Sequence, residues 1–221
     1  MKESGNRSIR ISYYNAFWLF MAGSLLGVVF EGVNRLALKG QWETHVLTIW
    51  GPFCTIYGLG MVGYYVGYKF LKDKNVLIQF LIFAIIGSTV EYLCGWLLKY
   101  GLQMGAWDYS GSFLNIQGIL SPSMMLVWGV AGVLFCKGYP YIDKIFVKMK
   151  GLGWRIAAII LTVFMIVNSI VTAACIVRWK NRHDGLPAAN RVEQRLDERY
   201  PDDYMQRRFC EWFFLDERES K

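Results

Sequence analysis

The chain has 221 residues, of which 54% are hydrophobic, and its mean hydropathy is +0.27. This composition is too apolar for an ordinary soluble domain of this length, and it predicts one membrane domain with a short polar tail and no second globular core. The net charge of +7 lies mostly in short loops and at the ends, as the positive-inside rule would produce. Nucleic-acid binding would need a basic face on a folded soluble module, and the sequence shows no such face.

Five apolar runs of helical length follow one another, and about 20 apolar residues are long enough to cross a bilayer as a helix. We expect an all-α, polytopic protein with about five transmembrane helices in a membrane domain, 1–178, followed by a polar, amphipathic C-terminal tail, 179–221. The expected spans are roughly 13–38, 46–70, 76–100, 119–136 and 156–177. Proline lacks an N–H group and clashes with the preceding turn. The second helix should therefore start or break at Pro52, which leaves 46–50 as a re-entrant or interfacial piece.

The first four spans have the pattern of a duplicated hairpin. Sliding the chain against itself without gaps aligns Glu31 with Glu91 and keeps a Gly-x-x-x-Glu pattern in register inside two membrane spans. Further matches are Phe20 with Phe80, Gly27 with Gly87, Gly51 with Gly111, Phe53 with Phe113, Ile56 with Ile116 and Gly58 with Gly118. We interpret about 13–70 and about 76–136 as two copies of one helical hairpin.

The distribution of Lys and Arg predicts which loops face the cytoplasm. It places the amino terminus, the 69–74 turn and the 137–155 connector on the cytoplasmic side. Five crossings would then put the tail outside, whereas the basic cluster at 178–182 argues against an outer tail. Either the tail escapes the charge rule or one apolar segment does not cross, and we favour five crossings.

Glu31 and Glu91 lie inside apolar spans, where an ionisable side chain is costly and by default marks a functional site. Repeated hairpins tend to place such a site at the interface between the repeats. Two nearby carboxylates in a low dielectric would not both stay ionised, and such a pair could bind a cation, exchange a proton or recognise a positively charged substrate. The alternative is a structural role. Arg35 lies one turn after Glu31 and could neutralise it, whereas Glu91 has Gly95 at that spacing and would need Lys99, Trp and Tyr polar groups or another helix.

The loop at 101–118 is rich in glycine and aromatic residues. Aromatic residues at the membrane surface usually anchor a helix, and Asp108 could cap a local turn. The functional alternative is a lid over the glutamates, with Asp108 and Asn115 completing a polar ring. The predicted substrate- or ion-binding residues are therefore Glu31, Glu91, Trp107, Asp108, Tyr109 and Asn115. These acids and His45 lack the spacing of metal ligands, so we expect no metal and no cofactor.

Several motifs, taken together, resemble one known family. They are the G-x-x-x-E run of the first span, GPF-x-x-IYG at 51–58, EY-x-x-GW-x-L at 91–98, WDYS at 107–110, N-x-x-G at 115–118, G-x-P-x-x-N at 185–190 and LDERYPDDYM at 196–205. The combination is similar to the bacterial ABC-transporter type IV permease family over nearly the whole chain. The resemblance implies a multi-pass transport permease of the bacterial plasma membrane, and the six predicted site residues occupy motif positions.

Three functions are compatible with these patterns. The leading hypothesis is a permease component that moves a small solute or ion, surrounded by membrane lipid and forming a homo-oligomer or pairing with a separate ATPase subunit. No Walker A sequence, Ser–His–Asp order or H-E-x-x-H is present, so we expect no catalytic residue. The alternatives are a membrane-embedded enzyme acting on a lipid or envelope precursor, with Glu91 and Asp108 as acid and base, and a non-catalytic scaffold whose tail binds a partner.

Overall fold

The computed structural model describes residues 11–42 and 45–219, and the chain is mostly helical (73%). The long elements are α1 (Tyr13–Lys39), α2 (Thr55–Leu71), α3 (Val76–Trp96), its π-helical extension η1 (Leu97–Gly101), α4 (Pro122–Lys148) and α5 (Leu152–His183). Among the described helices, α1, α3 with η1, α4 and α5 are long and apolar enough to cross a membrane. α2 has 17 residues and would rise about 26 Å, slightly less than the ~30 Å hydrocarbon core. Length therefore supports four of the five predicted spans and leaves α2 as the short one.

The ends of the helices follow from local sequence signals. Asn75 accepts a hydrogen bond from the third residue of α3, and Ser121 does the same for α4, whose first residue is Pro122. Gly40 ends α1 with a φ of 71°, a conformation that residues with a Cβ rarely adopt. These caps fix where the chain leaves each long helix.

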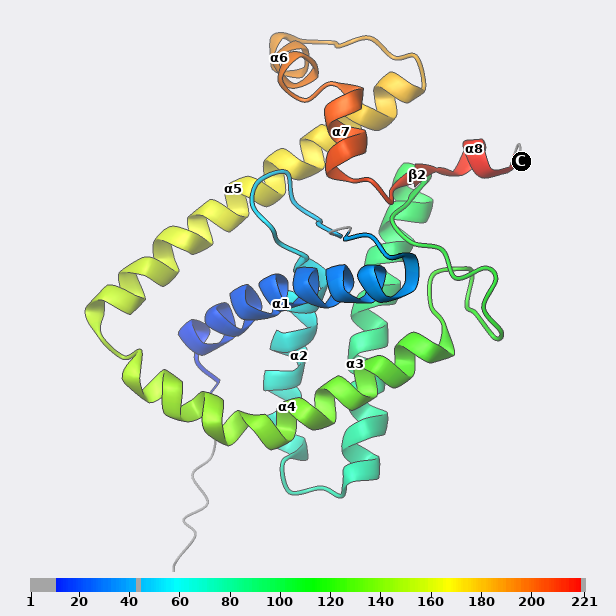
Figure 1. Ribbon diagram of the computed structural model, residues 1–221. Helices are drawn as coiled ribbons and strands as arrows, with labels where there is room; N and C mark the ends of the chain where they lie inside the picture. The colour runs from blue at the N-terminus through cyan, green and yellow to red at the C-terminus, as the bar shows by residue number, and fades with distance from the viewer. Residues whose placement is uncertain (1–10, 43–44, 220–221) are drawn as a thin grey trace, which may run out of the picture.

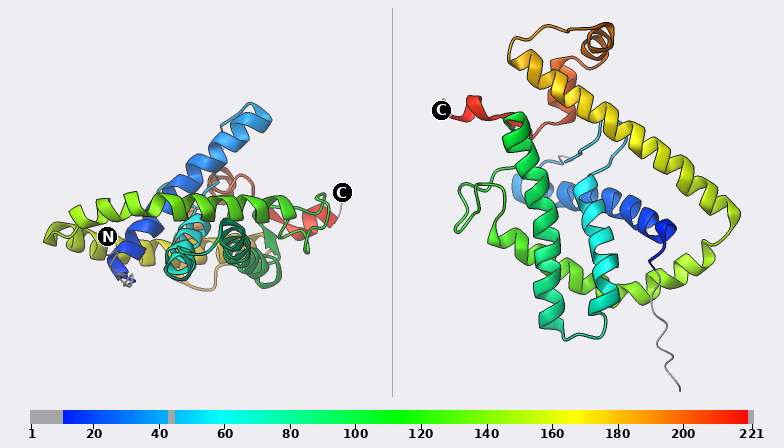
Figure 2. Two further views of the ribbon diagram at one scale, coloured as in Figure 1. Left: turned by 90° about the horizontal axis from the view of Figure 1, so that it is seen from below. Right: turned by 180° about the vertical axis from the view of Figure 1, so that it is seen from behind.

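The long helices pack as two pairs, α1 with α2 and α3 with α4. Figure 1 shows α2 and α3 side by side with α1 and α4 crossing them, and Figure 2 shows the same crossing from below and from behind. Glycines sit at the crossings: a Cβ on Gly58 would lie 2.3 Å from Ser24 Oγ, and one on Gly132 would lie 2.2 Å from Phe83 Cβ. Small residues allow such close approach between membrane helices. The pairing is the one expected of two hairpins, and the duplication itself stays a prediction.

The segment before α2 is irregular and buried, which is where Pro52 predicts a break. Part of its backbone is satisfied by α5. The Ile49 N–H donates to Thr172 Oγ1 at 2.8 Å, while Asn168 Oδ1 accepts from the Trp50 N–H at 3.2 Å and Asn168 Nδ2 donates to the Trp50 carbonyl at 2.9 Å. Non-helical backbone is tolerated at membrane depth only where the protein supplies such partners.

The C-terminal tail folds back onto the helices. It contains α6 (Arg191–Arg199), α7 (Asp202–Arg208), β2 (Phe213–Phe214) and α8 (Leu215–Glu219), and β2 pairs antiparallel with β1 (Met104–Gly105). Buried Met205 and Phe209 pack in one apolar cluster with Trp179 of α5. The predicted domain boundary between 178 and 179 falls inside α5, and the strand pair adds a small β element to the predicted all-α chain.

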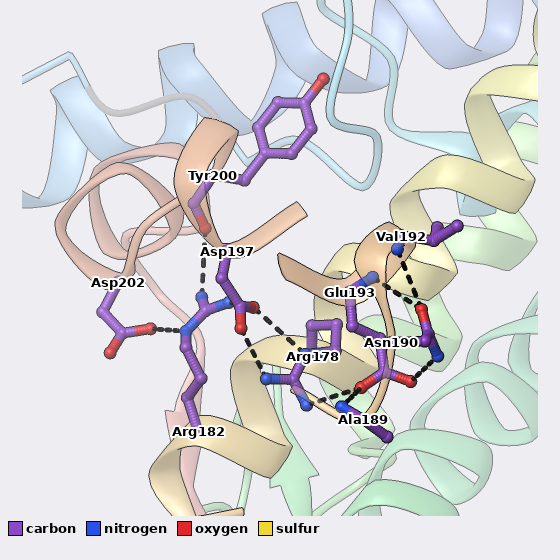
Figure 3. Close-up of polar contacts among 9 residues, drawn as sticks. All are labelled: Arg178, Arg182, Ala189, Asn190, Val192, Glu193, Asp197, Tyr200 and Asp202. Carbon is purple, nitrogen blue, oxygen red and sulfur yellow. Dashed lines mark hydrogen bonds and ion pairs between the residues drawn. The ribbon is translucent and has the colours of Figure 1, made fainter. Parts of the chain in front are cut away.

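The basic cluster at the end of α5 is paired with tail acids (Figure 3). Arg178, with 3% of its surface exposed, donates to Asp197 through Nε at 3.1 Å and through Nη2 at 2.6 Å, and its Nη1 lies 3.3 Å from Glu193 Oε2. Arg182 Nε lies 2.6 Å from Asp202 Oδ1. The hydrogen bonds from Arg178 hold the pKa of Asp197 below its usual value. These arginines therefore have a structural role that the loop-charge count does not include.

Candidate functional site

A cavity of about 610 Å³ lies between α1, α2, α3, α4, the loop after α3 and the tail. This volume is within the range of small-molecule sites, roughly 300–1,000 Å³. The lining residues are Phe30, Glu31, Asn34, Arg35, His45, Cys54, Ile56, Tyr57, Glu91, Ala106, Trp107, Asp108, Tyr109, Ser123, Met124, Val127, Trp128, Cys210, Glu211, Phe213 and Arg218. Five of the six predicted site residues are among them.

Glu91 of α3 is buried in the wall of this cavity, with 4% of its surface exposed. Its Oε1 accepts a hydrogen bond from the Tyr109 hydroxyl at 2.9 Å, and its Oε2 accepts one from Trp128 Nε1 at 2.7 Å. Gly87, one turn earlier, lies under the Trp128 ring, where a Cβ would be 2.4 Å from the ring atoms. The glycine therefore lets the indole lie flat enough on α3 to reach the carboxylate one turn further on.

Glu31 of α1 is held in the same way. The Tyr57 hydroxyl of α2 donates to Glu31 Oε1, and a Cβ on Gly27 would lie 2.4 Å from the Tyr57 ring. In each helix pair the glycine of the Gly-x-x-x-Glu pattern leaves room for an aromatic ring, and the glutamate one turn later accepts a hydrogen bond from the polar group of that ring. This geometry explains why glycine and glutamate are spaced by four residues.

Arg35 does not form the predicted neutralising pair with Glu31. Its guanidinium forms an ion pair with Glu211 of the tail, which His45 Nδ1 also contacts at 2.7 Å. A tail carboxylate that approaches from across the cavity competes successfully with the partner one helical turn away, whose interaction is weak in an exposed helix. Of the two roles left open for Glu31, neutralisation by Arg35 is therefore not the one seen.

The loop residues 107–109 form one side of the cavity. Trp107 Nε1 donates to the Ile119 carbonyl at 2.8 Å, and Asp108 accepts from the Ser110 N–H at 2.9 Å and pairs with Arg218 of the tail. Although desolvation acts to raise it, the pKa of Asp108 is lower than usual because of the Ser110 hydrogen bonds and the charge of Arg218. Burial and the neighbouring Glu91 raise the pKa of Tyr109, so its phenol stays protonated and remains a donor.

Asn115 does not line the cavity. Its side chain closes the loop, because Nδ2 donates to the Ser112 carbonyl at 2.9 Å and Oδ1 accepts from the Gly118 N–H at 2.8 Å. Lys99, a predicted option for Glu91, instead donates to a loop carbonyl at 2.7 Å. Both residues shape the loop at 101–118 from outside the cavity.

The charges of the lining do not balance. Arg35 and His45 pair with Glu211, and Arg218 pairs with Asp108. Within the described part of the chain, Glu31 and Glu91 have no ion-pair partner within 4.0 Å and accept only from neutral phenol and indole groups. An ionised carboxylate in such a place is unfavourable unless a positive charge compensates it. The cavity is therefore suited to receive a cation or a proton.

The profile of the family described as "Putative ABC-transporter type IV" matches residues 18–173. The chain belongs to this family. The match contains most of the long helices, and it includes both Gly-x-x-x-Glu patterns and the loop at 107–109. No curated protein and no solved structure matches the chain. The family and the four long apolar helices together indicate a membrane protein and a component of an ABC-type transporter.

In this member of the family, sequence reasoning missed two kinds of site residue. Tyr57 belongs to the GPF-x-x-IYG motif but is not among the predicted site residues, and neither is Trp128. An aromatic side chain with a polar edge inside an apolar span usually needs a hydrogen-bond partner, which is a usable signal. The tail residues Glu211, Phe213 and Arg218 gave no signal, because only the folding back of the tail brings them to the cavity.

Proposed function

We propose that the chain is the permease component of a transporter that moves a small solute or ion across the bacterial plasma membrane, with Glu31 and Glu91 in the binding site. The observation that carries the proposal is that one cavity holds two carboxylates that have no basic partner among the residues that the structure describes. Intramembrane acids that face a cavity are typical of substrate and ion pathways.

Contacts at the two ends of the molecule support five crossings with α2 as the short span. At one end, Arg35 near the end of α1 pairs with the tail, and β1 after α3 pairs with β2. At the other end, Trp18 of α1 packs against Trp154 of α5, with ring centroids 5.4 Å apart. These contacts put the starts of α1 and α5 at one end and the ends of α1, α3 and α5 at the other, which supports an odd number of crossings. The tail would then lie outside.

The matching arrangements at Glu31 and Glu91 support the duplicated hairpin. In both, a glycine precedes the glutamate by one turn and an aromatic side chain from the paired helix donates to the carboxylate. Rocking of one hairpin against the other would then change access to the site at their interface. Because the chain has no Walker A sequence, a separate ATPase subunit would supply ATP hydrolysis, and a second copy of the chain is a further expected partner.

The enzyme alternative fits the geometry less well. Asp108 is paired with Arg218, and its lowered pKa makes it a poor general acid at neutral pH. A scaffold role for the tail also has less support, because the tail already packs against its own helices.

The test measures the concentrations of solutes inside and outside bacterial cells. It compares cells that lack the gene with cells that express the wild type, Glu91→Gln or Glu198→Gln. Glu198 is exposed on α6 and is not among the lining residues of the cavity, so it is the matched control. We expect the solute differences made by the wild type to persist in Glu198→Gln and to disappear in Glu91→Gln at equal membrane levels. Unchanged solute profiles in Glu91→Gln would remove this residue from the mechanism.

A further inference from the structure

The cavity is lined by six aromatic side chains in addition to its acids: Phe30, Tyr57, Trp107, Tyr109, Trp128 and Phe213. Four of them have a polar edge, and each of these edges is occupied. The hydroxyls of Tyr57 and Tyr109 and the indole N–H of Trp128 donate to the two glutamates, and the indole N–H of Trp107 donates to a backbone carbonyl. Tyr57 and Trp128 also pack against each other and against helix glycines, so what the aromatic lining offers a ligand is its remaining π surface and C–H edges rather than hydrogen-bond donors.

Aromatic faces attract cations, and an organic cation gains most where water is excluded. Glu31 and Glu91 add the negative charge that such a ligand must neutralise, because neither has a basic partner among the described residues. Rings around a positive group, with carboxylates behind them, are a combination that binds alkylated ammonium ions.

A metal ion fits this cavity less well. Hard cations need about six or more oxygen ligands close together. Among the described residues, no three His, Cys, Asp or Glu side chains converge in a way that could hold a metal ion. Both Glu91 oxygens already accept a hydrogen bond, and a volume of about 610 Å³ is far larger than a bare ion requires.

A primary ammonium ion is also a poorer fit than a methylated one. It carries three N–H donors that each need an acceptor. The two carboxylates of the cavity accept from Tyr57, Tyr109 and Trp128, which reduces what they can offer to further donors. A quaternary ammonium group has no N–H and needs only negative charge and aromatic surface.

We propose that this cavity binds a quaternary ammonium group, held between the Glu31 and Glu91 carboxylates and the rings of Tyr57, Trp107, Tyr109 and Trp128. The inference rests on the proposed function, since it names the chemical class of the solute at the same site. The group can belong to a free solute or to a lipid headgroup, and the two sources share this chemistry.

The experiment uses the full chain in nanodiscs of phosphatidylglycerol, which has no quaternary ammonium group. Choline is titrated and compared with 3,3-dimethyl-1-butanol, its neutral isostere of the same shape, with tryptophan fluorescence and calorimetry as readouts. We expect saturable choline binding, at least tenfold weaker binding of the isostere, and a tenfold or greater loss of choline affinity in Glu31→Gln. Glu198→Gln should bind choline as the wild type does.

Two additional variants separate a folding defect from a loss of recognition. Tyr57→Phe keeps the ring and removes the hydroxyl, and Trp107→Leu removes a ring that does not contact either glutamate through a hydrogen bond. We expect Trp107→Leu to weaken choline more than tenfold while its circular dichroism spectrum matches the wild type, and its unfolding temperature should fall because packing and the hydrogen bond to Ile119 are lost. Tyr57→Phe should retain the preference for choline over the isostere.

Nanodiscs that contain phosphatidylcholine test whether the quaternary ammonium group comes from a lipid headgroup. If phosphatidylcholine competes with free choline for the cavity, the lipid is identified as the ligand. Equal binding of choline and its isostere, binding of sodium or potassium alone, or no choline binding in either disc would overturn the inference. Each of these results leaves the proposed function intact if Glu91→Gln still abolishes the solute differences in cells. Selective choline binding with unchanged solute profiles in Glu91→Gln would instead support the ligand class and contradict transport.

Discussion

Tyr57 of α2 and Trp128 of α4 lie against each other, with ring centroids 5.3 Å apart and ring planes inclined by 33°. Each ring donates to the glutamate of its own hairpin, Tyr57 to Glu31 and Trp128 to Glu91. The two carboxylates are therefore connected by a continuous path of two hydrogen bonds and one aromatic contact. A movement of one hairpin against the other would separate the rings and change the surroundings of both acids together.

The glycine before each glutamate should be sensitive to the smallest side chain. In Gly87→Ala the new Cβ would lie 2.4 Å from Trp128, which is buried and cannot move away freely. We expect this change to lower the free energy of unfolding by about 1–3 kcal/mol, the usual cost of overpacking. Thermal unfolding in nanodiscs measures this change.

Gly138→Ala is the matched control, because a Cβ at this position of α4 would meet nothing within 4 Å. Alanine is favoured over glycine inside a helix by about 1 kcal/mol, so the control should be neutral or slightly stabilising. Equal unfolding temperatures for the two variants would show that the ring of Trp128 is not held against Gly87.

The features that sequence could predict were local ones. The Gly-x-x-x-Glu repeat and the break at Pro52 depend on neighbours within a helical turn, and the structure has a cavity and an irregular segment at these places. The ion pair between Arg35 and Glu211 joins positions far apart in the chain, and no sequence spacing predicts that these two residues meet. The Glu31–Arg35 pair that helical spacing allows does not form, because an i,i+4 interaction of about 0.2–0.5 kcal/mol yields here to a tertiary contact.

The polar residues of the fifth predicted span differ in their roles. Asn168 has no exposed surface and satisfies both the N–H and the carbonyl of Trp50, whereas Ser169 is exposed on the same helix. Asn168→Leu should leave these backbone groups without partners and destabilise the protein by about 1–3 kcal/mol for each buried group. Ser169→Ala should change stability by less than about 0.5 kcal/mol, as surface changes do.

Hydrogen exchange at the segment before α2 checks this prediction. Amides at 46–51 should exchange faster in Asn168→Leu than in the wild type and in Ser169→Ala. Unchanged protection of this segment would mean that Asn168 does not hold it.

Glu211 joins the tail to the wall of the cavity through Arg35 and His45. Glu211→Gln removes the charge that attracts both groups, and β2 begins two residues after this position. We expect the amides of 213–214 to exchange faster by tenfold or more, since the β1–β2 pair is too short to hold the tail alone. Protection equal to that of Glu198→Gln, measured in the same way, would contradict this role.

The pairing of Arg178 with Asp197 predicts a pH dependence of the docking of the tail. The pKa of Asp197 is lower in the folded chain than in the unfolded chain because Arg178 donates to its carboxylate. The stabilisation is therefore fully present above the unfolded value of about 3.9 and is lost as the pH falls through the lower, folded value.

Asp197→Asn should destabilise the docked tail by about 2 kcal/mol at pH 7, which is less than the 3–5 kcal/mol of a fully buried pair because the Asp197 side chain is 22% exposed. The difference from the wild type should shrink as the pH falls below the unfolded value of about 3.9 and should vanish only below the lower, folded value, where Asp197 is protonated in both states. Fluorescence-detected unfolding in a pH series from about 7 to about 2 measures it. Asp203→Asn is the control, because the Arg207–Asp203 pair is 72% and 64% exposed and should contribute less than about 1 kcal/mol. A pH-independent difference between Asp197→Asn and the wild type would show that the charge of Asp197 does not hold the tail.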